Sequence, residues 1–536
     1  MDLPSLENVS DANLSGLKVP LMDLPSLENV SDADLSGIKV PLMDHQKTAL
    51  AWMKRREEQK PHGGILADDM GLGKTISAIS LVLASKNRNT NTFNGVTLVI
   101  CPASLLRQWE CEVKSKVSHE KLNIFVHHGR NRGRPEVLCT FDIVITTYGI
   151  AMREYKHSGN LFGVKWKRII LDEAHLVRNS KTITCEAVCE LRSNYRWALT
   201  GTPIQNEKLD LYALIKFLHY TPYGNLAEWK KRIENNKTDG QQKLKRLLEP
   251  LMLRRTKDQL KDIDKNRVPN KFYKPIMFEL DAEEEEVYDK IDRFKKYILN
   301  EEINIDGEYY KMHEKFKDME KGNAKHVLLL RLQQICCLPG LIVEMLDESD
   351  DEEENTGSVV PCIENNLERQ SSKMLKLMKT LAPIMNKSRD KVIIVSKWKS
   401  ALNILSNHLQ KAKWPTLSLN GSTKLKDRRS IVNKFNDPEN PNRILLLSLK
   451  AGGLGLNLVG ASHMLFFDIH WNPQLDLQAE GRIYRIGQKK DVIIHKFMCS
   501  NTIEESIFKV QKRKLEIAEG VLTVSNDIDT IEDILL

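Results

Sequence analysis

Residues 63–75 read GGILADDMGLGKT, a short apolar run that leads directly into a glycine-rich turn. A strand, turn and helix in this order place several backbone N–H groups at a helix N-terminus, where they can bind phosphate oxygens. Two glycines let the backbone approach the phosphates, Lys74 can reach them, and Thr75 can hold Mg²⁺. The usual GxxxxGK[ST] pattern starts with glycine, whereas Asp68 stands there in this chain. The stretch predicts a nucleotide-binding loop, and the structural alternative is a strand–helix turn with a surface lysine.

Further short apolar runs flank this turn, and stretches of helical character separate them. Continuous apolar runs of about four to eight residues are typical of strands buried on both faces of a parallel sheet. The chain contains two series of them, which predicts an α/β fold with two doubly wound parallel sheets in tandem. The first series comprises residues 63–67, 96–102, 122–127, 141–148, 168–172 and 196–200, and the second comprises 391–396, 416–420, 443–449, 463–468 and 491–497.

The N-terminal residues 1–42 are a 21-residue segment that occurs twice. The second copy has Asp34 in place of Asn13 and Ile38 in place of Leu17. Two copies are too few for a stacked repeat architecture, which needs three or more. The composition predicts a mostly disordered arm, with at most a short docking segment, and a duplicated exon is an alternative origin.

The rest of the chain divides into four expected parts. Residues 43–262 form a first lobe and residues 381–500 a second one. Between them, residues 263–380 are charged, helix-rich and without strand-like runs, and they contain an acidic loop at 347–357. Residues 501–536 are expected to form a C-terminal helix and tail.

The distribution of charge favours a polyanionic partner. The formal net charge is +8, but the run DESDDEEE at residues 347–354 carries seven acidic residues, so the remainder is near +15. Such an excess fits nucleic acid, and the alternative is a generally basic surface. No apolar run approaches the ~18 residues of a membrane span, and the first residues lack the pattern of a secretory signal. Nine cysteines without a CxxC pair argue against structural zinc.

A pair of carboxylates ends another apolar run. Residues 168–175 read RIILDEAH, about 100 residues after the phosphate loop. At the edge of a parallel sheet Asp172 would bind Mg²⁺, and Glu173 would polarise the attacking water. The alternative for two adjacent acids is a solvated turn.

Together with further segments, these motifs resemble the Swi/Snf-type ATPases of helicase superfamily 2, and the resemblance covers residues 42–517. It implies two RecA-like lobes with a helical insertion, ATP and Mg²⁺ as cofactors, and stepping along duplex DNA without strand separation. Gly481 departs from the family pattern, which more often has Asp there. The segments are DHQ (44–46), DDMGLGKT (68–75), VICPASLLRQW (99–109), DIVITTY (142–148), DEAH (172–175), LTGTPIQN (199–206), LRRTKDQL (253–260), LSLKAGGLGLNL (447–458), FDIHWNPQ (467–474) and QAEGRIYRIGQ (478–488).

The resemblance also implies roles for individual residues. Arg482 and Arg485 would act as arginine fingers, which together with Lys74, Asp172 and Glu173 make the catalytic set. Trp471 is either close to DNA or part of the core. The implied ATP-binding residues are Gln46, Asp68, Asp69, Met70, Gly71, Leu72, Gly73, Lys74, Thr75 and Gly455. The implied DNA-binding residues are Pro102, Ser104, Trp109, Thr146, Thr147, Thr200, Gly201, Lys397, Asn457 and Trp471.

Within the family, the resemblance is strongest to the branch that terminates transcription. It implies an ATP-dependent translocase on double-stranded DNA that displaces RNA polymerase II and releases transcripts in the nucleus. The alternative is a chromatin-remodelling or DNA-repair ATPase. Two rival classes are a catalytically inactive DNA-binding scaffold and a helicase that separates strands.

Overall fold

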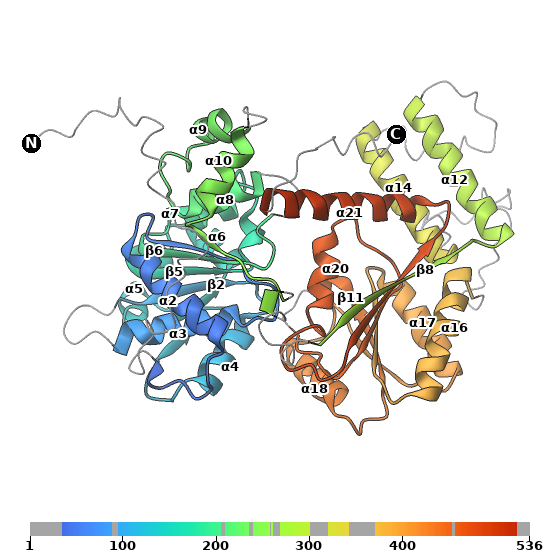
Figure 1. Cartoon of the computed structure of the whole chain (residues 1–536), viewed down its shortest axis with the longest axis horizontal. Coiled ribbons are helices and arrows are strands. Elements are labelled where there is room, and N and C mark those ends of the chain that lie inside the picture. Colours follow the sequence, from blue (N-terminus) through green and yellow to red (C-terminus); the bar gives the residue numbers. More distant parts are fainter. Residues whose placement is uncertain are drawn as a thin grey trace, which may run out of the picture. The chain divides into compact units, whose positions relative to one another are not determined.

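The computed structural model describes residues 35–87, 95–204, 209–234, 239–257, 259–260, 269–300, 320–341, 370–452 and 456–522. The chain divides into two compact units: the first comprises the residues up to Lys265 together with a segment that begins at Ile517, and the second runs from Asn266 to Glu516. Each unit is built on one parallel β-sheet with helices around it (Figure 1). The first copy of the N-terminal repeat and the acidic run lie outside the described residues. No helix among the described residues has the length and apolar character needed to span a membrane.

The first unit contains a seven-stranded parallel sheet with the order β3-β4-β2-β5-β6-β1-β7. All six strands that the sequence predicts for it are present. All residues of β1, β2 and β4 are buried, which is why these strands read as continuous apolar runs. The two-residue strand β7 was not predicted. The strands are β1 (Gly63–Leu66), β2 (Thr97–Cys101), β3 (Ile124–Val126), β4 (Ile143–Thr147), β5 (Trp166–Asp172), β6 (Ser193–Leu199) and β7 (Met252–Leu253).

Helices cover both faces of this sheet, so its core has two layers. One layer joins α2, α3 and α4 to the sheet through residues such as Leu50, Ile79 and Val113. The other joins α6, α7 and α8 through residues such as Ile150 and Val188. The helices are α2 (Asp44–Glu58), α3 (Lys74–Asn87), α4 (Leu106–Lys116), α5 (Pro135–Leu138), α6 (Tyr148–Lys156), α7 (Ile183–Glu190), α8 (Leu209–Phe217), α9 (Leu226–Trp229) and α10 (Asp239–Leu248), with the short 3-10 helices η4 (Asn160–Gly163) and η5 (Ala174–Val177) and the π-helix η6 (Lys230–Glu234).

The second unit contains a six-stranded parallel sheet with the order β10-β11-β9-β12-β13-β8. The five strands that the sequence predicts for it are all present. The strands are β8 (Lys271–Phe278), β9 (Val392–Ser396), β10 (Thr416–Leu419), β11 (Ile444–Ser448), β12 (His463–Phe466) and β13 (Val492–Cys499); the helices are α12 (Ala282–Asn300), α14 (Lys321–Cys337), α16 (Ser372–Lys387), α17 (Lys399–Lys411), α18 (Leu425–Asn436), α19 (Leu449–Gly452), α20 (Pro473–Glu480) and α21 (Ile503–Leu522).

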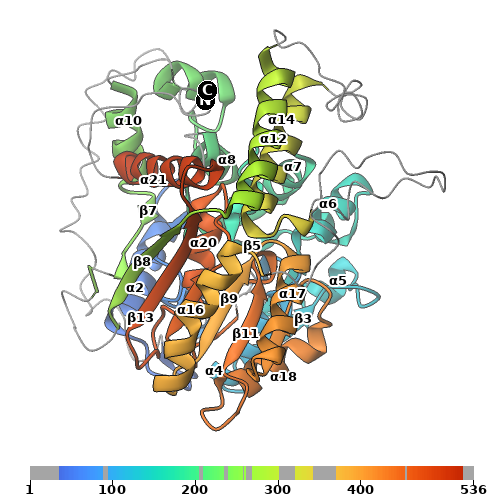
Figure 2. The ribbon, with the colours of Figure 1, turned by 90° about the vertical axis from the view of Figure 1, so that its right-hand side faces the viewer.

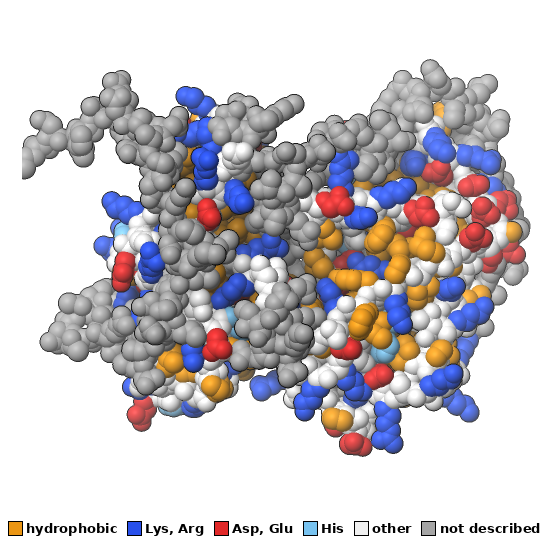
Figure 3. Space-filling model, viewed as in Figure 1, with side chains coloured by type: hydrophobic (Ala, Val, Ile, Leu, Met, Phe, Trp, Pro, Cys, Tyr) orange, Lys and Arg blue, Asp and Glu red, His pale blue; other side chains and the backbone are white. Residues whose placement is uncertain are grey.

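Strand β8 corrects one prediction, because residues 263–380 were expected to contain no strand. β8 pairs with β13 over its whole length, from Lys271 opposite Val492 to Phe278 opposite Cys499. It is an edge strand with mostly exposed side chains, and it includes Pro275, which edge strands tolerate. The sequence therefore lacks the apolar run of a central strand. Figure 3 shows apolar side chains gathered on the surface of the second unit. In β8 itself, Phe272, Tyr273 and Met277 are exposed.

The helices within residues 263–380 contribute to the core of the second unit. Figure 2 shows α12 and α14 side by side, and they bury Phe294 and Leu332 together with Ile507 of α21. Helix α16 packs Leu377 and Leu381 against the sheet. One ion pair is enclosed among these elements.

That buried ion pair joins Lys373 of α16 to Glu504 of α21 at 2.5 Å, and both side chains are 0% exposed. Burial is the largest single influence and opposes the charged form of Lys373, but the Glu504 carboxylate together with the neighbouring Cys337 and Cys336 outweighs it, and the pKa of Lys373 is raised. Glu504 also accepts a hydrogen bond from the Cys499 N–H at 2.9 Å. The pair therefore ties α16, α21 and the end of β13 together.

Replacing Glu504 by glutamine is expected to lower the free energy of unfolding of the second unit by about 3–5 kcal/mol, because it leaves a buried charge without its counterion. The double variant Lys373→Met/Glu504→Gln removes both charges and is expected to recover most of this loss. The matched control is Glu286→Gln, in a pair whose glutamate is 64% exposed, with an expected change below about 1 kcal/mol. Denaturant unfolding followed by amide exchange of β13 measures all three. Equal effects of Glu504→Gln and Glu286→Gln would contradict the interpretation.

Candidate functional site

The predicted nucleotide-binding loop lies between β1 and α3, at the carboxyl end of a strand inside the first sheet. Gly71 and Gly73 have φ values of +89° and +88°, which favour glycine over other residues. A Cβ atom on Gly73 would also lie 2.3 Å from Nε2 of Gln46. Both glycines are therefore required by the backbone of the loop.

The Lys74 side chain folds back over this loop. Its Nζ donates to the carbonyl oxygen of Asp68 at 2.6 Å and to that of Asp69 at 3.4 Å. A Cβ atom on Gly201, just after β6, would lie 3.5 Å from the same Nζ and 2.7 Å from Cγ of Met70. The ammonium group is thus held at the loop, beside the end of the neighbouring strand.

Helix α2 fixes the other side of the loop. His45 Nε2 lies 2.8 Å from the carbonyl oxygen of Leu72, and Gln46 Nε2 donates to the same oxygen at 3.1 Å. Oε1 of Gln46 accepts from the Met43 N–H at 3.1 Å. Both ends of the Gln46 amide are thus engaged within the unit, and its contact with adenine stays a prediction.

The segment after β7 holds the loop from a third direction, which the sequence interpretation missed. Arg255 donates to both carboxylate oxygens of Asp68, with Nε 2.9 Å from Oδ1, and its Nη1 donates to the His45 carbonyl. The Lys257 N–H donates to Oδ2 of Asp69 at 3.0 Å. The sequence singled out LRRTKDQL only as a family segment. Asp68 and Asp69 are therefore structural anchors of the loop.

Replacing Arg255 by methionine is expected to raise the KM for ATP about 10-fold or more, because it leaves the buried Asp68 carboxylate without its fork-shaped partner. Methionine retains apolar length, so the expected effect comes from the lost hydrogen bonds. Arg246→Met is the control, since Arg246 is an exposed residue of α10. Steady-state ATPase measurements check both variants, and an unchanged KM in Arg255→Met would contradict the role assigned to this pair.

The DEAH carboxylates lie at the end of β5. Asp172 accepts from Nε1 of Trp109 at 2.6 Å and from the Glu173 N–H at 3.1 Å. Burial raises the pKa of Asp172 to about 7, the neighbouring Glu173 charge adds to this, and the Trp109 hydrogen bond opposes it. A buried carboxylate beside a second one is an environment that a divalent cation would compensate, so Asp172 fits the predicted Mg²⁺ role.

Glu173 has an unusual backbone for a residue with a side chain. Its φ and ψ values are 52° and 51°, in the left-handed region. Such conformations persist where the surrounding structure imposes them, and they are concentrated at functional sites. Oε2 of Glu173 lies 3.4 Å from Nδ1 of His175, whose pKa is lowered by burial. The turn therefore places the Glu173 carboxylate beside His175 while Asp172 stays buried.

These features share one edge of the first sheet. The strands β5, β6 and β1 are consecutive in the sheet order, and all three run parallel. Asp172 ends β5, Thr200 and Gly201 follow β6, and the nucleotide loop follows β1. Carboxyl ends of parallel strands are where α/β sheets bind ligands.

Four of the residues predicted to bind DNA are buried in the first unit, and Trp109 and Thr146 are two of them. Trp109 is 1% exposed and bonded to Asp172. Thr146 is 0% exposed, and its hydroxyl donates to the His127 carbonyl oxygen at 3.0 Å. Neither side chain reaches the surface in this structure, so we assign them to positioning rather than to DNA contact.

The other predicted DNA-binding residues of the first unit vary in exposure. Thr147 and Thr200 are buried, and their hydroxyls accept N–H groups of Ile150 and Thr202 at 3.3 Å and 3.1 Å. Only part of the surface of Pro102, Ser104 and Gly201 is exposed.

In the second unit, the Lys397 side chain donates to Oε1 of Gln333 and lies over the Trp398 ring at 4.4 Å. Burial lowers the pKa of Lys397. Trp471 packs against the α12–α14 core. Of the two alternatives for this residue, proximity to DNA or packing in the core, the structure agrees with the second. Asn457 is exposed, whereas Gly455 lies outside the described residues.

The two arginines predicted as fingers follow α20. Arg482 is 6% exposed, and its carbonyl oxygen accepts the Leu458 N–H at 3.1 Å. Nη1 of Arg485 lies 3.5 Å from the carbonyl oxygen of Leu456. Both arginines are therefore linked to the end of the LSLKAGGLGLNL segment, in the second unit.

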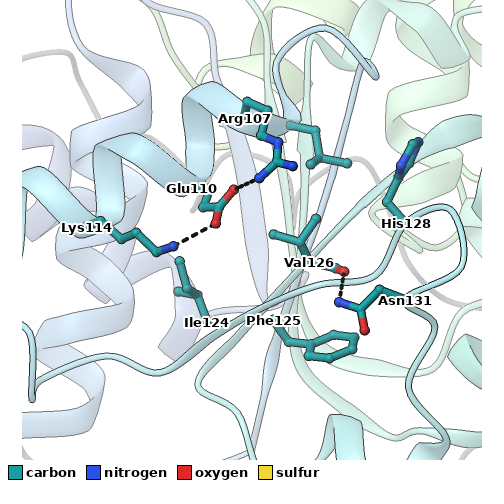
Figure 4. A pocket seen from close by; sticks show the side chains of 9 residues that line it. Arg107, Glu110, Lys114, Ile124, Phe125, Val126, His128 and Asn131 are labelled. Atoms are coloured by element: carbon teal, nitrogen blue, oxygen red, sulfur yellow. Dashed lines mark hydrogen bonds and ion pairs between the residues drawn. The ribbon is translucent and has the colours of Figure 1, made fainter. Parts of the chain in front are cut away.

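A cavity of about 350 Å³ lies between α4 and β3 in the first unit (Figure 4). Arg107 and Lys114 both pair with Glu110 there, at 2.8 Å and 2.7 Å. Both cations thus share the single carboxylate of Glu110, and we assign the cavity no ligand. The lining residues are Leu106, Arg107, Glu110, Lys114, Ile124, Phe125, Val126, His128 and Asn131, none of them from the nucleotide loop.

Comparison with known proteins places the chain in a family. Residues 45–341 match the model of the SNF2-related domain, and residues 372–487 match that of the helicase conserved C-terminal domain. The chain is 44% identical to transcription termination factor 2 of Drosophila melanogaster over 91% of its own length and 58% of the relative's. It is 30% identical to the DNA repair protein RAD5B of Arabidopsis thaliana, over 87% of the chain and 46% of the relative.

A solved structure, the Sulfolobus solfataricus SWI2/SNF2 ATPase core in complex with dsDNA, is similar with 28% identity and a TM-score of 0.42. The alignment covers 90% of this chain and 94% of that chain. The chain spans only about half of the length of the two curated relatives named above.

Proposed function

Because this chain belongs to the SNF2 family of DNA-dependent ATPases, we propose that it uses ATP hydrolysis to translocate on double-stranded DNA. The observation that carries the proposal is the nucleotide loop and the DEAH carboxylates at one edge of a parallel sheet. Lys74 sits at the loop, and Asp172 and Glu173 differ in burial and backbone conformation. A scaffold that only binds DNA has no need of this arrangement.

Each residue has a proposed role in hydrolysis. The loop N–H groups and Lys74 bind the phosphates of ATP. Glu173 accepts a proton from the attacking water and orients it. Thr75 and Asp172 are the residues that would hold Mg²⁺, which when bound neutralises charge on the phosphates. Arg482 and Arg485 are the proposed arginine fingers.

For the biological task, we propose displacement of RNA polymerase II from DNA with release of the transcript, in the nucleus. The support is the 44% identity to a transcription termination factor over 91% of this chain. DNA repair is the second candidate, supported by the 30% identity to a DNA repair protein.

ATP hydrolysis measured with no nucleic acid, single-stranded DNA, duplex DNA and RNA tests the enzyme class, with Lys74→Ala as the blank. We expect stimulation of ~10-fold or more by duplex DNA and none in the blank, since the lysine charge is lost from the phosphate site. Stimulation by RNA alone, or hydrolysis that persists in Lys74→Ala, would overturn the proposal.

Two further assays separate the tasks. Displacement of a third strand from a DNA triplex without unwinding of a forked duplex is expected of a translocase, whereas a helicase unwinds the fork. Release of RNA from a stalled polymerase II complex, dependent on ATP and lost in Lys74→Ala, is expected of a termination factor. Triplex displacement without transcript release would favour the repair alternative.

A further inference from the structure

The second copy of the N-terminal repeat ends in a segment that is docked on the first unit. We call residues 35–42, which read LSGIKVPL, the docking segment. The Lys39 N–H donates to the Lys116 carbonyl at 2.8 Å, and the Ser118 N–H donates to the Gly37 carbonyl at 2.8 Å. Ile38 forms an antiparallel bridge with Val117. The segment thus adds a short strand-like pairing to the end of α4.

Apolar side chains anchor the same segment. Leu42 is buried in the core layer of α2, α3 and α4, and Leu35 and Ile38 pack against that layer. Gly37 has a φ of +96°, and a Cβ atom there would lie 2.7 Å from Cγ of Lys121. The docked conformation therefore requires glycine at this position and apolar residues at three others.

The first copy of the repeat meets all of these requirements. Residues 14–21 read LSGLKVPL, with Gly16 in the place of Gly37 and Leu21 in the place of Leu42. The single difference within the segment is Leu17 in the place of Ile38, two side chains of equal volume. The docking surface consists of Lys116, Val117, Ser118, Lys121 and the adjacent core layer, and the sequences of both copies meet its requirements.

We propose that residues 14–21 are a second occupant of this docking surface in the same chain, in exchange with residues 35–42. Only Met43 separates the docking segment from α2, so the short connection favours the second copy by effective concentration. Docking of the first copy adds 21 residues to that connection. The entropic cost of closing a loop grows only with the logarithm of its length. The longer connection therefore still allows the first copy to dock.

The exchange acts on the nucleotide loop. His45 and Gln46, in the first turn of α2, both contact the Leu72 carbonyl of that loop. With the second copy docked, the start of α2 is held by the core layer through Leu42. With the first copy docked, that restraint on α2 is released, so the repeat is a device for loosening or holding one wall of the nucleotide site.

Amide exchange of Ser118 in the full chain tests the proposal, because its N–H donates to the docked segment. Ile38→Asp disables the second copy, Leu17→Asp disables the first, and the double variant disables both. Slow exchange of β5 amides in every variant shows that the first unit stays folded. The measurement is repeated over a 50-fold range of protein concentration.

We expect Leu17→Asp to leave the exchange rate of Ser118 unchanged. Ile38→Asp is expected to raise the rate less than about 3-fold, since the first copy takes over, and the double variant about 10-fold or more. Equal rates in Ile38→Asp and the double variant would overturn the proposal. Protection of Ile38→Asp that grows with protein concentration would also overturn it, because the occupant would then be a second chain.

Discussion

Replacing Glu173 by glutamine is expected to lower the kcat of duplex-stimulated ATP hydrolysis by about 10²–10⁴-fold, the range for loss of a general base. Glutamine has the same size and keeps the left-handed turn that the surrounding residues impose on position 173. It cannot accept the proton of the attacking water. Binding of ATP is expected to persist, because the loop and Lys74 are unchanged. Single-turnover hydrolysis and a separate ATP-binding titration measure the two effects.

The matched control is Glu190→Gln, since Glu190 is an exposed residue at the end of α7. Its kcat is expected to equal that of the unaltered chain. A Glu173→Gln variant with full activity would refute the assigned base. A variant that no longer binds ATP would show that Glu173 supports the loop instead of the chemistry.

The second large effect is expected for Arg485→Ala, with a loss of about 10³–10⁵-fold in kcat, the range for removal of an arginine finger. Arg485→Lys is expected to recover little of it, because lysine lacks the planar fork of donors. ATP affinity is expected to change less than 10-fold, since a finger acts mainly in the transition state. The measurement is duplex-stimulated ATPase at saturating ATP.

Arg389→Ala is the control for this second prediction, as Arg389 is an exposed arginine of the second unit. Unfolding of the second unit at the same denaturant concentration in Arg485→Ala and the unaltered chain excludes a folding defect. Loss of ATP affinity in parallel with kcat would indicate a ground-state role for Arg485.

The sequence predicted the strands that are buried on both faces, because such strands carry an unbroken apolar signal. Eleven predicted runs correspond to β1–β6 and β9–β13, and among these the edge strands β3 and β10 are only partly buried. It missed β8, whose exposed and proline-containing stretch resembles a surface segment. β8 is a strand because it pairs with β13, and pairing with a distant segment leaves no pattern in the local sequence.

The candidate site shows the same limit. The residues of the nucleotide loop and the DEAH turn are contiguous, so their spacing predicted them. The fork from Arg255 to Asp68 and the bond from Trp109 to Asp172 join residues 187 and 63 positions apart. No pattern in the sequence predicts these pairs, and only the fold shows that Trp109 and Thr146 face inward.

The edge strand β8 has a consequence for synthesis of the protein on the ribosome. It can pair only with β13, and the Asn270 N–H donates to Oδ1 of Asp491, 221 residues further along. At about 5–20 residues per second, β8 waits on the order of 10–45 s for its partner to be translated. The second sheet therefore cannot be completed before β13 has been translated, and the exposed Phe272, Tyr273 and Met277 of β8 are present in the nascent chain throughout that interval.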